Sequence, residues 1–90
     1  MRERDVMVAI QLAAHKYNCV LFRNNTGILK DIRGNHVKFG LCVGGADLIG
    51  WTICNGTAVF TAVEVKRLGQ KPTKEQAAFI AAVNKAGGIA

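Results

Sequence analysis

Two stretches of the chain carry apolar residues at the three- and four-residue spacing of an amphipathic helix. The first runs from Glu3 to about Lys16. The second begins at Thr73, where Gln76 completes the pattern of a capping box, and Gly87-Gly88 end it. The apolar positions expected to be buried are Val6, Met7, Ala9, Ile10, Ala13 and Ala14 in the first helix, and Phe79, Ile80, Val83 and Ala86 in the second.

Three other apolar runs predict strands. Residues 19–23 (CVLFR) are rich in β-branched and aromatic side chains and are followed by the turn-forming sequence NNTG. Two longer runs, Ala46 to Cys54 and Thr57 to Lys66, are joined by Asn55-Gly56, the dipeptide most typical of a two-residue type I′ turn. These two runs therefore predict a β-hairpin.

The segment between the first strand and the hairpin shows no clean period. From about Asn24 to Gly45 it is punctuated by glycines, and it carries Lys30, Arg33, His36 and Lys38. Long loops inside small domains are uncommon and often functional, so we predict a basic binding loop, with a short strand around Val37 to Val43 as the alternative. The predicted order is helix, strand, long loop, strand, strand, helix.

The predicted hairpin brings two carboxylates together. With a two-residue loop, Asp47 faces Glu64 across the ladder, and Lys66 lies on the same face two residues further along. Opposed Cβ atoms in an antiparallel pair lie about 4.5–5.5 Å apart, where like charges destabilise the sheet. The rest of that face is apolar, with Trp51 opposite Phe60.

A positive group is therefore expected beside the two carboxylates. The candidates are Lys66 alone, or a divalent cation coordinated by both carboxylates and a backbone carbonyl. Such hard oxygen donors suit Mg²⁺ or Mn²⁺. The competing interpretation is an ordinary salt bridge at the exposed ends of the two strands.

Composition narrows the classes of function. The 90 residues are half apolar and carry a formal net charge of +6, so we expect one domain spanning 1–90 with a polyanionic partner. A domain this small buries only about 60% of the surface that its unfolded chain exposes, which favours a dimer. The sequence lacks an apolar run of membrane-spanning length and a secretory leader pattern, and we expect a cytoplasmic protein.

Other chemistries fit these residues poorly. Cys19, Cys42 and Cys54 lie in apolar stretches without a paired spacing, so we expect buried, reduced thiols. A zinc site that combines them with His15 and His36 would match no familiar ligand spacing. The chain contains no serine, which excludes Ser-His-Asp catalysis, and its glycines form neither a phosphate-binding loop nor a dinucleotide fingerprint.

Several segments together resemble one nuclease family. They are GADLIG at 45–50, VEVKR at 63–67, Glu75-Gln76, Gly87-Gly88, the start of the first helix, and residues 22–27. Over nearly the whole chain this pattern resembles the VRR-NUC family, a branch of the PD-(D/E)XK nuclease superfamily. The resemblance implies a minimal PD-(D/E)XK (restriction-endonuclease-like) α/β fold, in the order α-β-β-β-α with a central mixed sheet flanked by helices.

The sequence departs from that family pattern in two places. Ala46 stands where the superfamily has the proline that names it, and that position sets backbone shape without supplying a ligand. Only Ile89-Ala90 remain of a strand that usually follows the glycines. A second subunit would supply the missing sheet edge, or the segment is absent.

The resemblance also implies roles for individual residues. Asp47 and Glu64 would hold Mg²⁺ or Mn²⁺, with the carbonyl of Val65 as a third ligand. Lys66 would orient the attacking water or stabilise the phosphate.

Two further residues carry an implied role beside a simpler one. Glu3 would approach the metal from the first helix, although an acidic residue there also favours the first helical turn. Gln76 would support the site from the second helix, although its capping box competes for the same side chain.

The implied function is a metal-dependent, structure-selective DNA endonuclease that acts on branched or four-way junction DNA as a homodimer. It would leave a 5′-phosphate and a 3′-hydroxyl, and the family suggests a phage or mobile-element origin with action in the host cytoplasm. The alternative is a non-catalytic nucleic-acid-binding module in which Asp47, Glu64 and Lys66 form structural ion pairs. Phosphate contacts, which carry no sequence information, are predicted for Arg2, Arg4, Arg23, Lys30, Arg33, Lys38, Arg67, Lys71 and Lys74.

Overall fold

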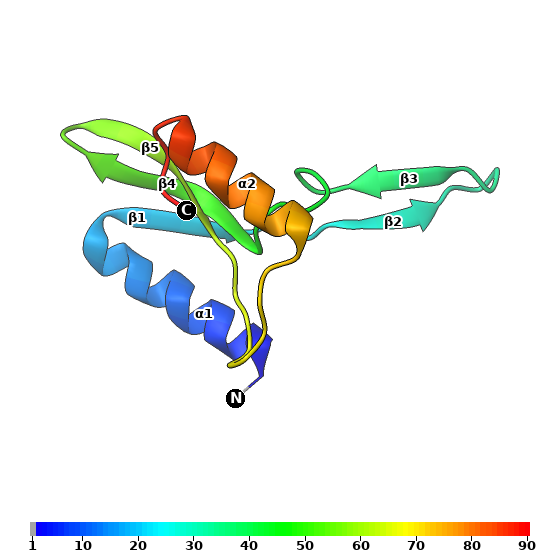
Figure 1. The fold of residues 1–90 in the computed structure, drawn as a ribbon, viewed down its shortest axis with the longest axis horizontal. Helices are drawn as coiled ribbons and strands as arrows, with labels where there is room; N and C mark the ends of the chain where they lie inside the picture. Colours follow the sequence, from blue (N-terminus) through cyan, green and yellow to red (C-terminus); the bar gives the residue numbers. More distant parts are fainter. Residues whose placement is uncertain (1) are drawn as a thin grey trace.

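A three-stranded antiparallel sheet in the order β1-β4-β5 forms the centre of the computed structural model, which describes residues 2–90 (Figure 1). The strands span Cys19–Arg23 (β1), Leu48–Cys54 (β4) and Thr57–Val63 (β5). The β4–β5 ladder joins Cys54 to Thr57 and Leu48 to Val63, which confirms the register predicted from the two-residue loop. Asn55 and Gly56 both have positive φ, as a type I′ turn requires.

Both predicted helices are confirmed. α1 spans Glu3–Ala14 and continues as the 3₁₀ turn η1, His15–Tyr17, while α2 spans Lys74–Lys85. The capping box at the start of α2 is complete, because the Thr73 side chain accepts a hydrogen bond from Gln76 N, and Gln76 Oε1 accepts one from Thr73 N. The N-terminus of α2 is therefore fixed at the residue that the sequence indicated.

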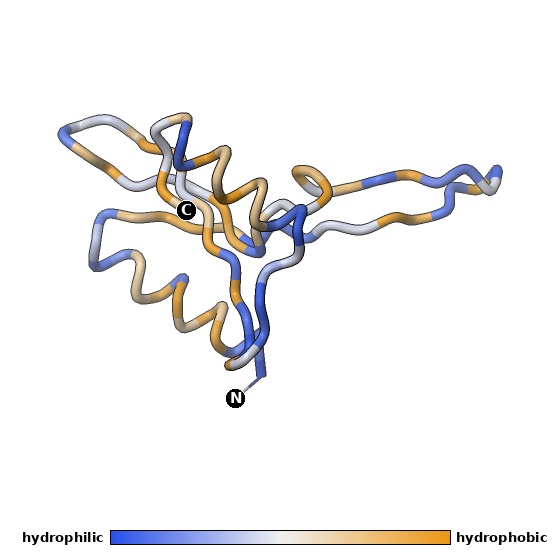
Figure 2. Tube along the Cα trace, viewed as in Figure 1, coloured by the Kyte–Doolittle hydropathy of each residue, from blue (hydrophilic) through white to orange (hydrophobic). Residues whose placement is uncertain are grey.

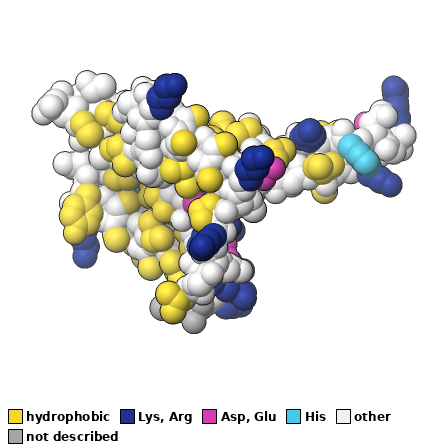
Figure 3. All heavy atoms as spheres, viewed as in Figure 1, with side chains coloured by type: hydrophobic (Ala, Val, Ile, Leu, Met, Phe, Trp, Pro, Cys, Tyr) yellow, Lys and Arg dark blue, Asp and Glu magenta, His cyan; other side chains and the backbone are white. Residues whose placement is uncertain are grey.

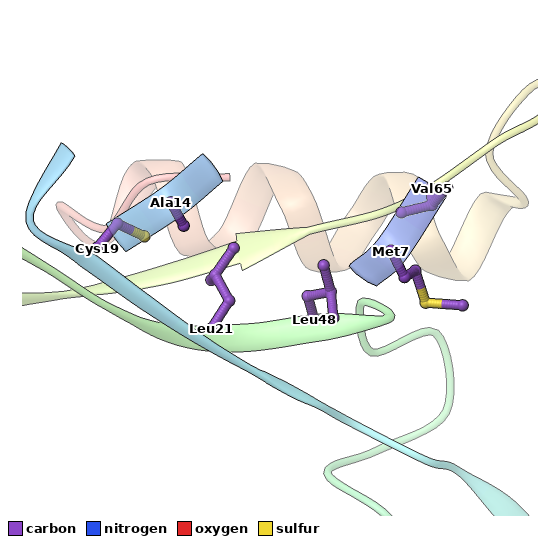
Figure 4. Packing of buried hydrophobic residues seen from close by; sticks show 6 residues of the cluster. All are labelled: Met7, Ala14, Cys19, Leu21, Leu48 and Val65. Carbon is purple, nitrogen blue, oxygen red and sulfur yellow. The ribbon is translucent and has the colours of Figure 1, made fainter. Parts of the chain in front are cut away.

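The core lies between α1 and one face of the sheet. Met7 and Ala14 of α1 pack with Cys19 and Leu21 of β1 and with Leu48, which is fully buried (Figure 4). Val65 completes this cluster from the segment that follows β5. The buried face of α1 is narrower than predicted, since the short side chains of Ala9 and Ala13 are exposed.

The predicted buried face of α2 is only half-buried. Phe79, Ile80 and Val83 are partly covered, and Ala86 is exposed. Alternation along β5 turns Ala58, Phe60, Ala62 and Glu64 away from the α1 core. Phe60 and Ala58 line an open groove of about 580 Å³ with Phe79 and Val83. The apolar side of α2 remains open because the helix packs along the edge strand and does not lie across the middle of the sheet.

The prediction of a long loop is wrong, because residues 27–39 form a second hairpin, which we call the arm. Its strands are β2, Gly27–Lys30, and β3, His36–Phe39, and they pair only with each other in a separate two-stranded sheet. The alternative, a short strand around Val37 to Val43, is confirmed in part by β3. The observed order is therefore α-β-β-β-β-β-α, with two strands more than predicted. Each run has only four residues, too few for a period to stand out among the surrounding glycines and charges.

The arm extends away from the rest of the molecule (Figure 1). The molecule measures 48 × 31 × 24 Å, and its radius of gyration of 14.6 Å exceeds the roughly 12 Å of a compact chain of this length. Apolar and polar stretches follow one another along both strands of the arm (Figure 2). The protein thus consists of a small packed body and one projecting arm.

The predicted mixed sheet contains parallel pairing at an isolated β-bridge near the C-terminus. Ile89 pairs in parallel with Thr61 of β5, so the last residues add a short piece of strand to the sheet edge. The α/β fold class with flanking helices is confirmed. Within residues 2–90, neither helix has the length and apolar character needed to cross a membrane.

The cysteine prediction holds only in part. All three thiols are free, but Cys19 alone is buried, whereas Cys42 and Cys54 are exposed. Cys54 is exposed because it ends β4 beside the hairpin turn. Cys42 lies in the connection between the arm and β4, outside the core cluster.

Candidate active site

The two predicted carboxylates meet just beyond the ends of two paired strands. The ladder ends with Leu48 paired to Val63, so Asp47 precedes β4 and Glu64 follows β5 at the same edge of the sheet. Asp47 Oδ2 accepts a hydrogen bond of 2.9 Å from the backbone N–H of Val65. This bond fixes the Asp47 carboxylate beside the segment that carries Glu64.

Asn24 holds the backbone around Asp47. Its side-chain amide donates to the Ala46 carbonyl at 3.0 Å, and its backbone N–H donates to the Asp47 carbonyl at 2.8 Å. Its Oδ1 also accepts a hydrogen bond from Leu41 N. Asn24 therefore positions Asp47, a role that the sequence analysis missed. The available signal was a side chain with both donor and acceptor atoms directly after a strand.

The Glu64 side chain is only 6% exposed, whereas that of Lys66 is 26% exposed. Burial and then the hydrogen bond and negative charge of the neighbouring Asp47 carboxylate together raise the pKa of Glu64 from 4.5 to about 7, while Lys66 acts in the opposite direction. The desolvation of a carboxylate and the proximity of a like charge thus outweigh the nearby ammonium group. Lys66 alone does not neutralise the pair.

Two side chains contact the same oxygen of Glu64. Lys66 Nζ lies 3.7 Å from Glu64 Oε1, and Gln76 Nε2 donates a hydrogen bond to that oxygen at 3.3 Å. Gln76 reaches Glu64 with its amide nitrogen while its amide oxygen completes the capping box. The two roles predicted to compete are therefore filled at the same time.

The four residues predicted to be catalytic, Asp47, Glu64, Lys66 and Gln76, come together in this way. Glu3 lies further out, where it lines a pocket of about 220 Å³ with Val65, Lys66 and Arg67. Within residues 2–90, three or more His, Cys, Asp or Glu side chains do not converge on one point, so neither Glu3 nor the cysteines and histidines complete a preformed cluster. The zinc alternative gains no support from the fold.

The donors at the site fit a hard divalent cation better than other groups. Two carboxylates lie side by side, and the pKa of Glu64 stays near 7 although an ammonium group is close. A cation that takes oxygen ligands would favour the ionised form of both. Asp47 and Glu64 would hold it, with the backbone carbonyl of Val65 as the predicted third ligand.

The predicted phosphate-binding residues occupy several exposed surfaces. Three lie on the arm, where Figure 3 shows Lys and Arg side chains together with a histidine. Three follow β5 or begin α2, and Arg67 borders the pocket next to Lys66. Arg2 and Arg4 lie at the start of α1, with Arg2 3.4 Å from Asp5, and Arg23 ends β1. All nine are exposed, so they are available to a polyanion.

Comparison with models of known protein families gives a match over nearly the whole chain. Residues 4–90 match the family model of the VRR-NUC domain. No curated protein and no solved structure matches the chain.

Proposed function

The chain belongs to the VRR-NUC family and is a nuclease-type domain, and on that premise we propose that it hydrolyses DNA phosphodiesters with Mg²⁺ or Mn²⁺ held by Asp47 and Glu64. The observation that carries this proposal is the pair of adjacent carboxylates. They lie at one sheet edge with Lys66 and Gln76 on the same Glu64 oxygen. A raised carboxyl pKa beside a second carboxylate is typical of a site that takes up positive charge.

The side chains of the site have distinct tasks. When bound, the cation supplies the charge neutralisation and the acidified water that phosphodiester hydrolysis needs. Asp47 and Glu64 bind it, and Glu64 must release its proton to do so. Lys66 places a positive charge beside the phosphate or the attacking water. Gln76 is a positioning residue, since it holds Glu64 Oε1 from the first turn of α2.

The proposed substrate is branched or four-way junction DNA, bound as a homodimer. The exposed Lys and Arg side chains would contact phosphates. Such contacts select DNA by its shape and charge and do not depend on its sequence. The dimer is supported by apolar residues on the sheet face opposite α1 that the body leaves half-exposed. These include Trp51, which packs against Phe22 with ring centroids 5.6 Å apart, and Phe60. The family resemblance further implies a phage origin and action in the host cytoplasm.

Asp47→Asn tests the catalytic proposal. The amide keeps an oxygen that can accept the Val65 N–H bond but loses the charge that binds a cation. We expect cleavage in Mn²⁺ to fall at least about a hundredfold, while the affinity for DNA in metal-free buffer stays within about twofold. Asp5→Asn, the same change at an exposed position of α1, is the matched control and retains cleavage.

The same experiment separates the nuclease from the non-catalytic module. A purified protein that binds DNA but leaves a panel of linear and branched DNAs intact in both metals would favour the module. Full cleavage by Asp47→Asn would contradict the proposed site, because an activity independent of Asp47 does not belong to it.

A further inference from the structure

The arm has two chemically different faces. The β2–β3 register pairs Ile28 with Lys38 and Lys30 with His36, so these four side chains share one face. The opposite face carries Leu29, Val37 and Phe39, with the Phe39 ring over Gly27. All of these side chains except the glycine are exposed. One face of the arm is thus predominantly basic and the other apolar.

The tip of the arm is an ordered turn. Asp31 Oδ1 accepts hydrogen bonds from the backbone N–H groups of Arg33 and Asn35, at 2.9 and 2.8 Å. Asp31 N donates to the Asn35 carbonyl, and Gly34, with φ of +81°, donates to the Asp31 carbonyl. The single acidic side chain of this turn is therefore engaged with the backbone, and the tip keeps a defined shape.

This turn presents an isoleucine at the end of the arm. Ile32 is fully exposed. It lies two residues after Lys30 and directly before Arg33. A large aliphatic side chain at the apex of a projecting hairpin gains nothing for the folding of the body. Apolar side chains flanked by cations are the residues that proteins insert between base steps, with the cations on the adjacent phosphates.

The root of the arm is tied to the candidate active site. Asn24, which fixes the backbone of Asp47, also accepts a hydrogen bond from the backbone N–H of Leu41, two residues after the arm. The Phe39 ring lies over Gly27, where it stiffens the first pair of the arm. The hydrogen bonds of Asn24 therefore connect the segment that follows the arm with the segment that carries Asp47. They orient the arm relative to the carboxylates.

We propose that the arm is the element that recognises branched DNA: its basic face follows a phosphate backbone, and Ile32 is a wedge that inserts where stacking is interrupted at a strand junction. This inference rests on the proposed function, because it assumes a DNA substrate at the carboxylate site. About 17 Å of extended chain separates the root from the tip, which corresponds to about five base pairs of duplex. The arm is long enough to contact a duplex several base pairs away from its root.

A binding experiment in EDTA measures the wedge separately from cleavage. Fluorescence anisotropy gives the affinity for a forked duplex and for a plain duplex of the same length. We expect wild-type protein to prefer the fork and Ile32→Ala to lose about tenfold of that preference, because the alanine methyl group buries much less apolar surface than isoleucine. Ile32→Leu retains the preference, and Leu12→Ala, at an exposed position of α1, leaves it unchanged.

Replacing the lysines of the arm should change DNA binding in a different way from replacing Ile32. Lys30→Gln combined with Lys38→Gln weakens binding to both DNAs and lowers the slope of log affinity against log salt by about 2. The preference for the fork stays as in the wild type. The matched control is Lys16→Gln combined with Lys85→Gln, which removes equal charge outside the arm.

Three results would overturn the proposal. One is a fork preference that survives Ile32→Ala, and another is an equal loss from the two lysine pairs. The third is a change in the mass of the particle in solution with Ile32→Ala, which would assign the arm to contacts between copies. Binding is measured without metal, so the two proposals can fail separately. A protein that binds forks through Ile32 but never cleaves would contradict the proposed nuclease activity and still support the proposed role of the arm.

Discussion

At the scale of single residues, Gln76 and Asn24 show how a few amide groups organise the site. Each uses both ends of its side chain: Gln76 joins the start of α2 to Glu64, and Asn24 joins the segment of Asp47 to the end of the arm. The proximity of Asp47 and Glu64 could be predicted because a two-residue turn dictates the register. Contacts of Asn24 depend on where the arm folds, which local sequence does not determine.

The pKa of Glu64 makes the stability of the metal-free protein depend on pH. Because burial and Asp47 raise this pKa from 4.5 to about 7, the folded state keeps a proton that the unfolded state has lost between those values. The free energy of unfolding should therefore be highest below about pH 4.5 on account of this group and fall by about 3 kcal/mol as the pH rises to 7.

Urea denaturation at a series of pH values, in EDTA, measures this dependence. Glu64→Gln should remove it, because a neutral amide mimics the protonated carboxyl at every pH. Glu75→Gln, at an exposed position in the first turn of α2, should leave it in place. Added Mn²⁺ should stabilise wild-type protein more at pH 8 than at pH 6, since binding requires the ionised carboxylate. A wild-type curve that coincides with that of Glu64→Gln would contradict the raised pKa.

At the scale of elements, the long, strongly patterned segments could be predicted and the short ones could not. α1, α2 and the β4–β5 hairpin each have seven or more residues or a defining turn, and all three formed. The two strands are shorter than predicted, since β4 begins at Leu48 and β5 ends at Val63. The arm has two strands of four residues, and its turn depends on Asp31 accepting hydrogen bonds from residues two and four positions away. Such a turn has no two-residue signature comparable to Asn55-Gly56.

The half-buried state of α2 has a related cause. The amphipathic pattern predicts which side of a helix is apolar, but it does not specify how much of that side the body covers. Here the edge position of β5 leaves the groove between Phe60 and Phe79 open. The apolar side of α2 and the exposed sheet face therefore remain available to a second subunit.

At the scale of the whole molecule, the proposed dimer follows from this uncovered apolar surface. Ile53 is a good test position, because it lies on the sheet face opposite α1 and its side chain is nearly half-exposed. We expect wild-type protein to have twice the 9.7 kDa chain mass by light scattering at micromolar concentration, and Ile53→Glu to be monomeric. The matched control, Leu12→Glu on α1, should leave the mass unchanged. A wild-type particle of 9.7 kDa would contradict the dimer.

Anomalous diffraction from crystals soaked in Mn²⁺ shows whether Asp47 and Glu64 share a divalent cation. We predict a peak within about 2.0–2.2 Å of an oxygen from each carboxylate in the wild type and its loss in Asp47→Asn. A Mn²⁺ peak bound only by other residues, or the two carboxylates ordered and apart with density for the ion absent between them, would contradict the account.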